Sequence, residues 1–141
     1  MNILISNDDG IRAEGIAHLA AAALPFGRVF VAAPQSQCSG MSQKLTIRGA
    51  LAVERVDFPV PVEAAWAVGG TPADCVKAAV KALVPCRPDV VLTGVNQGWN
   101  AGLDIAYSGT IGAALEGVMN GIPAIAFSAR EHCDPGAMEV Y

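Results

Sequence analysis

Short apolar runs alternate with amphipathic segments along this chain. The runs at 1–6, 28–33 and 89–94 have strand length and are apolar on both faces, a pattern typical of parallel strands covered by helices on both sides. Apolar residues at helical spacing predict a helix over 13–24, ended by Pro25. A strand, a helix and a strand in this order predict a right-handed parallel unit. The predicted fold class is therefore α/β, with a Rossmann-like, mostly parallel sheet and helices on both faces.

Two more helices are predicted further along. Thr71 suits an N-cap, Pro72 suits the first turn, and Asp74 stands where the second residue of a capping box belongs. Pro85 ends this helix. Another helix is predicted over 111–121, with a glycine as its terminator.

The segment between 45 and 68 has a different pattern. Apolar and polar residues alternate at 45–48, 52–58 and 64–68, and glycine and proline interrupt them. We expect short, partly exposed and antiparallel strands here.

Composition narrows the class of protein. A chain of 141 residues with 52% hydrophobic and 16% charged residues predicts one globular domain over 1–141. No apolar run approaches the ~18 residues of a membrane span, and the N-terminus resembles no signal peptide, so we expect a cytoplasmic protein without a membrane partner. A net charge of −4 argues against binding to a nucleic-acid duplex. The four cysteines lack metal-site spacing and are expected to be reduced.

The loops at the predicted strand ends carry the candidate chemistry, because open α/β sheets bind ligands there. Asp8 and Asp9 follow the first strand, and two adjacent carboxylates repel each other unless a cation or a shared proton lies between them. The alternative is that they cap the following helix. Ser39 and Asn96 lie in loops after two other strands, where their oxygens complete an all-oxygen site for Mg²⁺ or Mn²⁺.

The start of the late helix is a second candidate. Ser108 and Thr110 offer hydroxyls beside free backbone N–H groups, an arrangement that suits a phosphate. An ordinary helix cap explains the same residues. Motifs for P-loop, dinucleotide and serine-hydrolase chemistry do not occur in the sequence.

Four separated motifs resemble the SurE family of survival-protein 5′-nucleotidases over essentially the whole chain. They are Ser6-Asn7-Asp8-Asp9-Gly10-Ile11, Ser39-Gly40, Gly70-Thr71-Pro72-Ala73-Asp74-Cys75-Val76, and the run from Thr93-Gly94-Val95-Asn96 through Tyr107-Ser108-Gly109-Thr110 to Glu116-Gly117. The resemblance implies that Asp8, Asp9, Ser39 and Asn96 bind one divalent cation, Mg²⁺ or Mn²⁺. It also implies hydrolysis of nucleoside 5′-monophosphates and, in full-length members, a homodimer or homotetramer.

These implications give each residue a predicted role. Asp8 is expected to orient or deprotonate the attacking water as well as to bind the metal. The predicted substrate-binding residues are Gly40, Asn100, Ser108, Gly109 and Thr110.

The chain departs from the resemblance in length. Family members are generally longer, whereas this sequence stops at Tyr141 just after Asp134 and Pro135 predict a new helix. We therefore expect a truncated chain whose oligomeric state the sequence does not determine.

Two alternatives to the hydrolase stay open. A truncated chain can be a nucleotide-binding module without activity. A phosphoacceptor receiver domain has a similar size and an acidic pair after its first strand, with Asp57 as its acceptor, but it needs a late lysine and none follows Lys81.

Overall fold

The computed structural model describes residues 1–129, so the predicted helix at Asp134 and Pro135 lies outside the described residues. The elements in chain order are β1 (Asn2–Ser6), α1 (Glu14–Ala23), η1 (Leu24–Phe26), β2 (Arg28–Pro34), β3 (Val53–Arg55), β4 (Ala64–Val68), α2 (Pro72–Ala78), η2 (Ala79–Leu83), β5 (Val90–Gln97), η3 (Gly102–Ala106), α3 (Gly109–Met119) and β6 (Ala124–Ala129).

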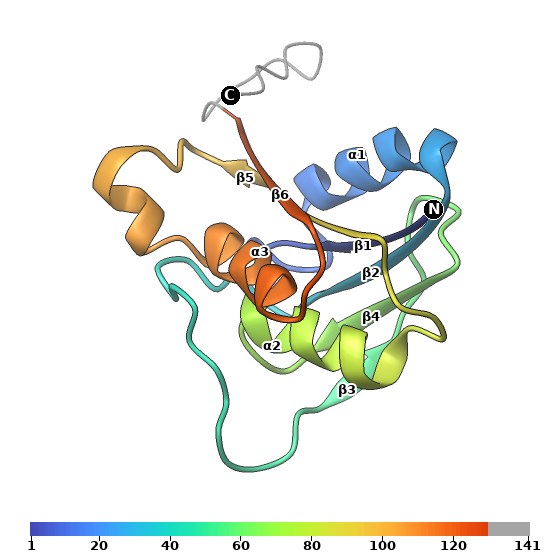
Figure 1. The fold of residues 1–141 in the computed structure, drawn as a ribbon, viewed down its shortest axis with the longest axis horizontal. Helices are drawn as coiled ribbons and strands as arrows, with labels where there is room; N and C mark the ends of the chain where they lie inside the picture. The colour runs from blue at the N-terminus through green and yellow to red at the C-terminus, as the bar shows by residue number, and fades with distance from the viewer. Residues whose placement is uncertain (130–141) are drawn as a thin grey trace.

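One six-stranded sheet organises these elements, in the order β3-β4-β2-β1-β5-β6 (Figure 1). The pairs β1·β2, β1·β5, β2·β4 and β5·β6 are parallel, and only β3 runs antiparallel, beside β4. The α/β prediction is confirmed. Because β1 is central, its carboxyl end lies between the carboxyl ends of β2 and β5.

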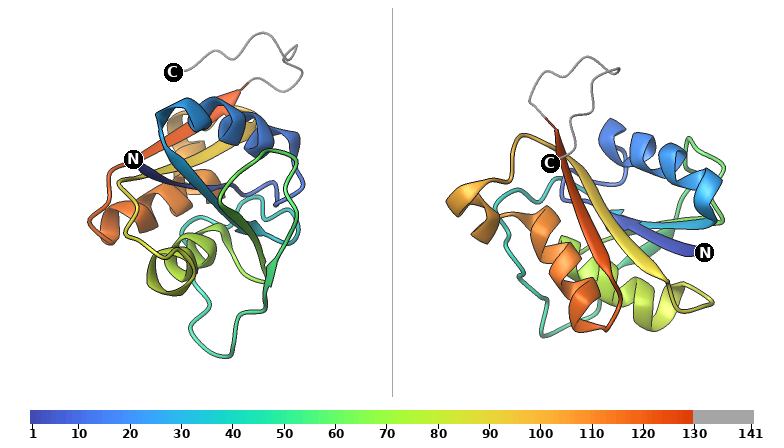
Figure 2. Two further views of the ribbon diagram at one scale, coloured as in Figure 1. Left: turned by 90° about the vertical axis from the view of Figure 1, so that its right-hand side faces the viewer. Right: turned by 45° about the horizontal axis from the view of Figure 1, so that its top comes forward.

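Both faces of the sheet are buried, which explains the apolar strands. Ile3 and Ile5 of β1 pack in a cluster with α1, whereas Leu4 packs on the opposite face with α2 and α3. The two layers of helices are visible on either side of the sheet in Figure 2. Each of these side chains is at most 1% exposed, a burial that stabilises a fold by roughly 1.5–3 kcal/mol per large aliphatic residue.

The capping box of α2 is confirmed. The Thr71 hydroxyl accepts a hydrogen bond from the Asp74 backbone N–H, and the Asp74 carboxylate accepts one from the Thr71 N–H. The same carboxylate also accepts bonds from the backbone N–H and the hydroxyl of Thr46. One acidic side chain therefore joins the start of α2 to the long loop before β3.

That loop corrects one prediction. The expected strand at 45–48 is wrong, because Thr46 is held by the Asp74 carboxylate rather than by a neighbouring strand, and Ile47 is 91% exposed. The strand predicted at 52–58 is shorter than expected, and as β3 it is antiparallel. The strand predicted at 64–68 is β4, but the expectation that it is partly exposed and antiparallel is only partly right. It is antiparallel to β3 but parallel to β2, and it is mostly buried because it has a neighbour on each side.

The second half of the sheet contains two features that the sequence did not predict. The edge strand β6 was missed, although Ala124-Ile125-Ala126-Phe127 is an apolar run of strand length; its residues are only partly buried. Strand β5 extends three residues beyond the predicted end at 94. Its register against β6 shifts between Thr93 and Asn96, a bulge of the kind that redirects a side chain.

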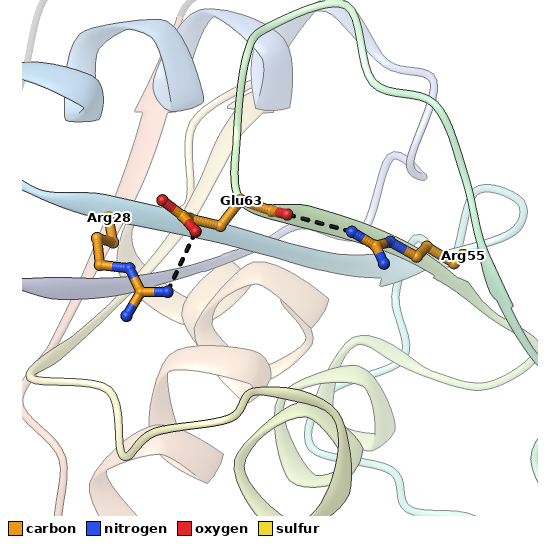
Figure 3. A network of polar contacts seen from close by, with 3 residues as sticks. All are labelled: Arg28, Arg55 and Glu63. Atoms are coloured by element: carbon orange, nitrogen blue, oxygen red, sulfur yellow. Dashed lines mark hydrogen bonds and ion pairs between the residues drawn. The ribbon is translucent and has the colours of Figure 1, made fainter.

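The amino end of the sheet carries exposed charges. Arg28, at the start of β2, forms an ion pair with Glu63 at 3.1 Å, and Arg55 of β3 donates to the Glu63 carbonyl oxygen (Figure 3). The pair tethers the segment that leads into β4.

None of the helices in the described part of the chain has the length and apolar character needed to span a bilayer.

Candidate active site

Loops from three neighbouring strands meet the start of α3 at the carboxyl edge of the sheet. They enclose a cavity of about 310 Å³, and all four predicted metal ligands line it: Asp8, Asp9, Ser39 and Asn96. Asp8 and Asp9 follow β1, Ser39 follows β2 and Asn96 lies near the end of β5. Residues 88 positions apart in the sequence therefore contribute oxygen atoms to one space.

Asp8 is the most firmly held of these residues, and it is 4% exposed. The Thr110 hydroxyl donates to Oδ1 of Asp8 at 2.5 Å, and the backbone N–H of Cys38 donates to the Asp8 carbonyl oxygen at 2.7 Å. A Cβ added to Gly109 would lie 2.8 Å from the Asp8 Cβ and 3.1 Å from Oδ2. The first turn of α3 therefore fits closely around the Asp8 carboxylate.

The turn that carries the two aspartates is fixed by Asn7, which is fully buried. Its side-chain amide donates to the Gly10 carbonyl oxygen, and its side-chain oxygen accepts the Gly10 N–H. Sequence reasoning missed this role, although an asparagine before the acidic pair is a typical turn signal. The alternative that Asp8 and Asp9 cap α1 is wrong, because Ala13 is the N-cap and no side chain caps that helix.

The charge of the acidic pair is not balanced by a cationic side chain from residues 1–129. No lysine, arginine or histidine is among the described residues that line the cavity. Burial raises the pKa of Asp9, and the negative charge of Asp8 raises it further. Hydrogen bonds from the Gln97 backbone and the Gln37 side chain lower the pKa of Asp9 only in part. The site therefore favours a bound cation or a proton.

The bulge in β5 positions Asn96. Gly94 precedes it with φ +120°, and a Cβ there would lie 2.4 Å from the Phe127 carbonyl oxygen of β6, so only glycine fits this position. The Asn96 side-chain nitrogen donates to the Gly98 carbonyl oxygen at 2.8 Å. This bond fixes the orientation of the amide and leaves its oxygen available to the cavity.

The predicted substrate residues fall into two groups. Gly40, Asn100 and Ser108 line the cavity with the four metal-ligand candidates. Ser108 is the N-cap of α3, and its hydroxyl oxygen accepts the Ile111 N–H, so the hydroxyl proton is available for donation. Gly109 and Thr110 are buried behind this lining, where Thr110 contacts Asp8 instead.

Sequence reasoning missed four other residues of the lining: Gln37, Gln97, Asp104 and Tyr107. All four lie in the loops that were expected to be functional, or at their edge. Polar residues in such loops are common, so no signal in a single sequence distinguishes those that face a cavity.

The donor set suits a hard divalent cation. Within residues 1–129, no group of three or more histidine, cysteine, aspartate or glutamate side chains is arranged to hold a metal ion. A site here therefore needs the hydroxyl of Ser39 and the amide oxygen of Asn96 beside the two carboxylates. An all-oxygen set of this kind is typical of Mg²⁺ and Mn²⁺. Metal binding itself stays a prediction.

The Cys38 thiol lies next to Ser39 in the same loop. Burial raises its pKa, and the charges of Asp8 and Asp74 raise it further, so the thiol is protonated at neutral pH and is a poor nucleophile. Cys38, Cys75 and Cys86 are unpaired, as expected. Cys133 lies outside the described residues.

Comparison with known proteins is consistent with this geometry. The profile of the SurE family, described as survival protein SurE, matches residues 3–140. The chain is 49% identical over 132 residues to a 5′-nucleotidase SurE from Pelotomaculum thermopropionicum, a match that covers 94% of this chain and 51% of that protein. A 5′-nucleotidase SurE from Protochlamydia amoebophila is 45% identical, with the same coverage of both chains.

A solved structure extends the likeness to three dimensions. The crystal structure of the SurE protein from Aquifex aeolicus superposes with a TM-score of 0.83 and is 42% identical, covering 92% of this chain and 51% of that one. The chain thus spans about half the length of the curated relatives it matches. From its sequence and its fold together, this chain belongs to the SurE family.

Proposed function

We propose that this chain carries the active site of a metal-dependent phosphomonoesterase that hydrolyses nucleoside 5′-monophosphates to nucleoside and phosphate. The observation that carries the proposal is the convergence of Asp8, Asp9, Ser39 and Asn96 on one cavity. Relatives that share almost half of its residues are named 5′-nucleotidases, which supports the same reaction class.

The proposed cofactor is one Mg²⁺ or Mn²⁺ ion held by these four residues. When bound, such an ion neutralises phosphate charge and lowers the pKa of water. The protein supplies the rest of the chemistry. The Thr110 hydroxyl fixes the Asp8 carboxylate through a hydrogen bond to Oδ1, and Asp8 orients or deprotonates the attacking water.

The substrate phosphate is proposed to face the Ser108 hydroxyl. This group donates a hydrogen bond to a phosphoryl oxygen while its own oxygen accepts the Ile111 N–H. The N-terminal end of α3 adds the positive end of a helix dipole on the same side. Donors fixed in this way stabilise the charge that develops on the phosphoryl oxygens.

Phosphate release from adenosine 5′-monophosphate (AMP), with Mn²⁺ and with a chelator, tests the proposal. We expect metal-dependent release, and Asp8→Asn should lower it by more than about 100-fold, because even residues that only support metal ligands contribute 10–100-fold. Asp57→Asn is the matched control, since Asp57 is exposed and lies at a separate cavity. Metal-independent release, or full activity after Asp8→Asn, would contradict the proposal.

The same assay decides between the alternatives. A nucleotide-binding module without activity is the second candidate, because the chain spans half the length of its relatives, and it would bind AMP without releasing phosphate. The structure does not favour a receiver domain. Asp57 follows the antiparallel strand β3, so the chain leaves that strand at the end of the sheet opposite to Asp8 and Asp9.

A further inference from the structure

A second and larger cavity adjoins the candidate metal site. Its volume is about 640 Å³, twice that of the polar cavity, and its lining is mainly apolar, with Ile105, Ile111 and Phe127 among its residues. Asn100 lines both cavities, so the two spaces adjoin at this residue. A volume of this size is typical of sites for small organic molecules.

The two cavities share one wall, formed by η3 and the start of α3. Asp104 and Ser108 line the polar cavity, whereas Ile105 and Ile111 line the apolar one. Neighbouring residues on the same two elements therefore present opposite chemistry to the two spaces. Asn100 at the junction is fixed, because its side-chain nitrogen donates to the Ser128 hydroxyl of β6 at 2.8 Å.

A ligand that fits both spaces has one anionic end and one planar, weakly polar end. We propose that the apolar cavity binds the base of a nucleoside monophosphate whose phosphate lies in the polar cavity, and that Ile105 determines the preference for nucleotides over simpler phosphate esters. The inference rests on the proposed function and adds a location for the base. Trp99 and Phe127 also line this cavity, and stacking of a base on an aromatic side chain contributes about 1–3 kcal/mol with little sequence preference.

The first test compares two phosphate esters that differ only in the base, AMP and ribose 5-phosphate, in the presence of Mn²⁺. We expect kcat/KM for AMP to exceed that for ribose 5-phosphate by about tenfold or more. Ile105→Asn should lower kcat/KM for AMP about tenfold and leave kcat/KM for ribose 5-phosphate unchanged. An unchanged ratio after Ile105→Asn would overturn the proposal.

Two further variants separate binding from folding. Leu103→Asn is the matched control, because Leu103 lies on the same element, is 87% exposed and does not line the cavity. Leu103→Asn should leave kcat/KM unchanged for both AMP and ribose 5-phosphate. Ala126→Leu adds bulk to the cavity from β6 and should lower kcat/KM for AMP selectively, as Ile105→Asn does. Equal losses for both substrates would indicate a structural defect and contradict a role in base recognition.

A second test does not depend on catalysis. Saturation-transfer NMR with adenosine, which has no phosphate, should show transfer to the base protons in the unmodified chain without metal. The signal should weaken in Ile105→Asn and persist in Leu103→Asn. If these three NMR results are obtained but no phosphate is released from AMP, the proposed hydrolase activity is wrong and the proposed base site stands. Absent or unaltered transfer would reject the base site.

Discussion

Acidic side chains at the two ends of the sheet differ in burial and in whether a cationic side chain balances their charge. At the amino end, Glu63 is exposed and paired with Arg28, whose pKa it raises through a hydrogen bond and its charge. At the carboxyl end, Asp8 and Asp9 are adjacent and more buried, and within residues 1–129 no cationic side chain lines their cavity. The comparison teaches that the groups surrounding a carboxylate, rather than the carboxylate itself, indicate whether it is structural or awaits a ligand.

Asp74 is an intermediate case. Burial alone would raise its pKa, but hydrogen bonds from Thr46 and Thr71 together lower it. This carboxylate is balanced by donors rather than by a cation. We therefore expect substitutions around Asp8 to affect activity, a substitution of Asp74 to affect stability, and a substitution of Glu63 to affect neither.

The largest effect in this comparison is expected for Gly109→Ala. Alanine favours a helix over glycine by about 1 kcal/mol, yet its Cβ would lie 2.8 Å from the Asp8 Cβ and 3.2 Å from the Cys38 carbonyl oxygen. We expect Mn²⁺ affinity, measured by calorimetry, to fall by about 10–100-fold. Unchanged affinity in a variant of normal stability would mean that α3 does not constrain Asp8.

Thr110→Val should have the next largest effect. Valine has the shape of threonine without the hydroxyl that donates to Asp8 Oδ1. Loss of such a supporting bond lowers metal affinity by about tenfold or more. Thr110→Ser keeps a hydroxyl and is the control, so it should retain most of the affinity. Equal losses of metal affinity in the two variants would show that the packing of Thr110, rather than its hydrogen bond to Asp8, supports metal binding.

Asp74→Asn should change stability rather than activity. It weakens a helix cap and the bonds to Thr46, for which we expect a loss of about 1–2 kcal/mol in the free energy of unfolding at pH 7. Because the pKa of Asp74 is lowered on folding, its stabilisation is present above the unfolded pKa of about 3.9 and is lost as pH falls through the folded pKa.

Urea unfolding at several pH values measures this effect. The difference between the unmodified chain and Asp74→Asn should be largest near neutral pH and should shrink below about pH 4. A difference that stays constant with pH would show that the ionised form of Asp74 contributes nothing.

The smallest effect is expected for Glu63→Gln. Exposed ion pairs contribute little to stability, and this one lies at the end of the sheet remote from the cavity. The melting temperature and the rate of phosphate release should both stay within experimental error. A clear loss of activity would show that the amino end of the sheet influences the cavity at the carboxyl end, contrary to this comparison.

Much of this fold could be predicted from local patterns. The buried strands β1, β2 and β5 were recognised because residues such as Ile3 and Leu4 are apolar on both faces, and α2 was recognised from its capping box. The position of Ile47 could not be predicted, because it depends on a distant carboxylate, Asp74. Strand β6 was missed although its first four residues are apolar.

The candidate site shows the same division. Strand ends indicated that Asp8, Ser39 and Asn96 lie near one another, and they line one cavity. The contact between Thr110 and Asp8 was not predicted, because it joins residues 102 positions apart. The apolar cavity behind η3 could not be predicted either, since β6, which forms part of its lining, was missed.

The most direct test of the central claim is the anomalous difference density of a crystal of this chain soaked in Mn²⁺. We predict one strong peak within about 2–2.5 Å of oxygen atoms from Asp8, Asp9, Ser39 and Asn96. No peak in this cavity, or a peak bound by other residues, would contradict the account.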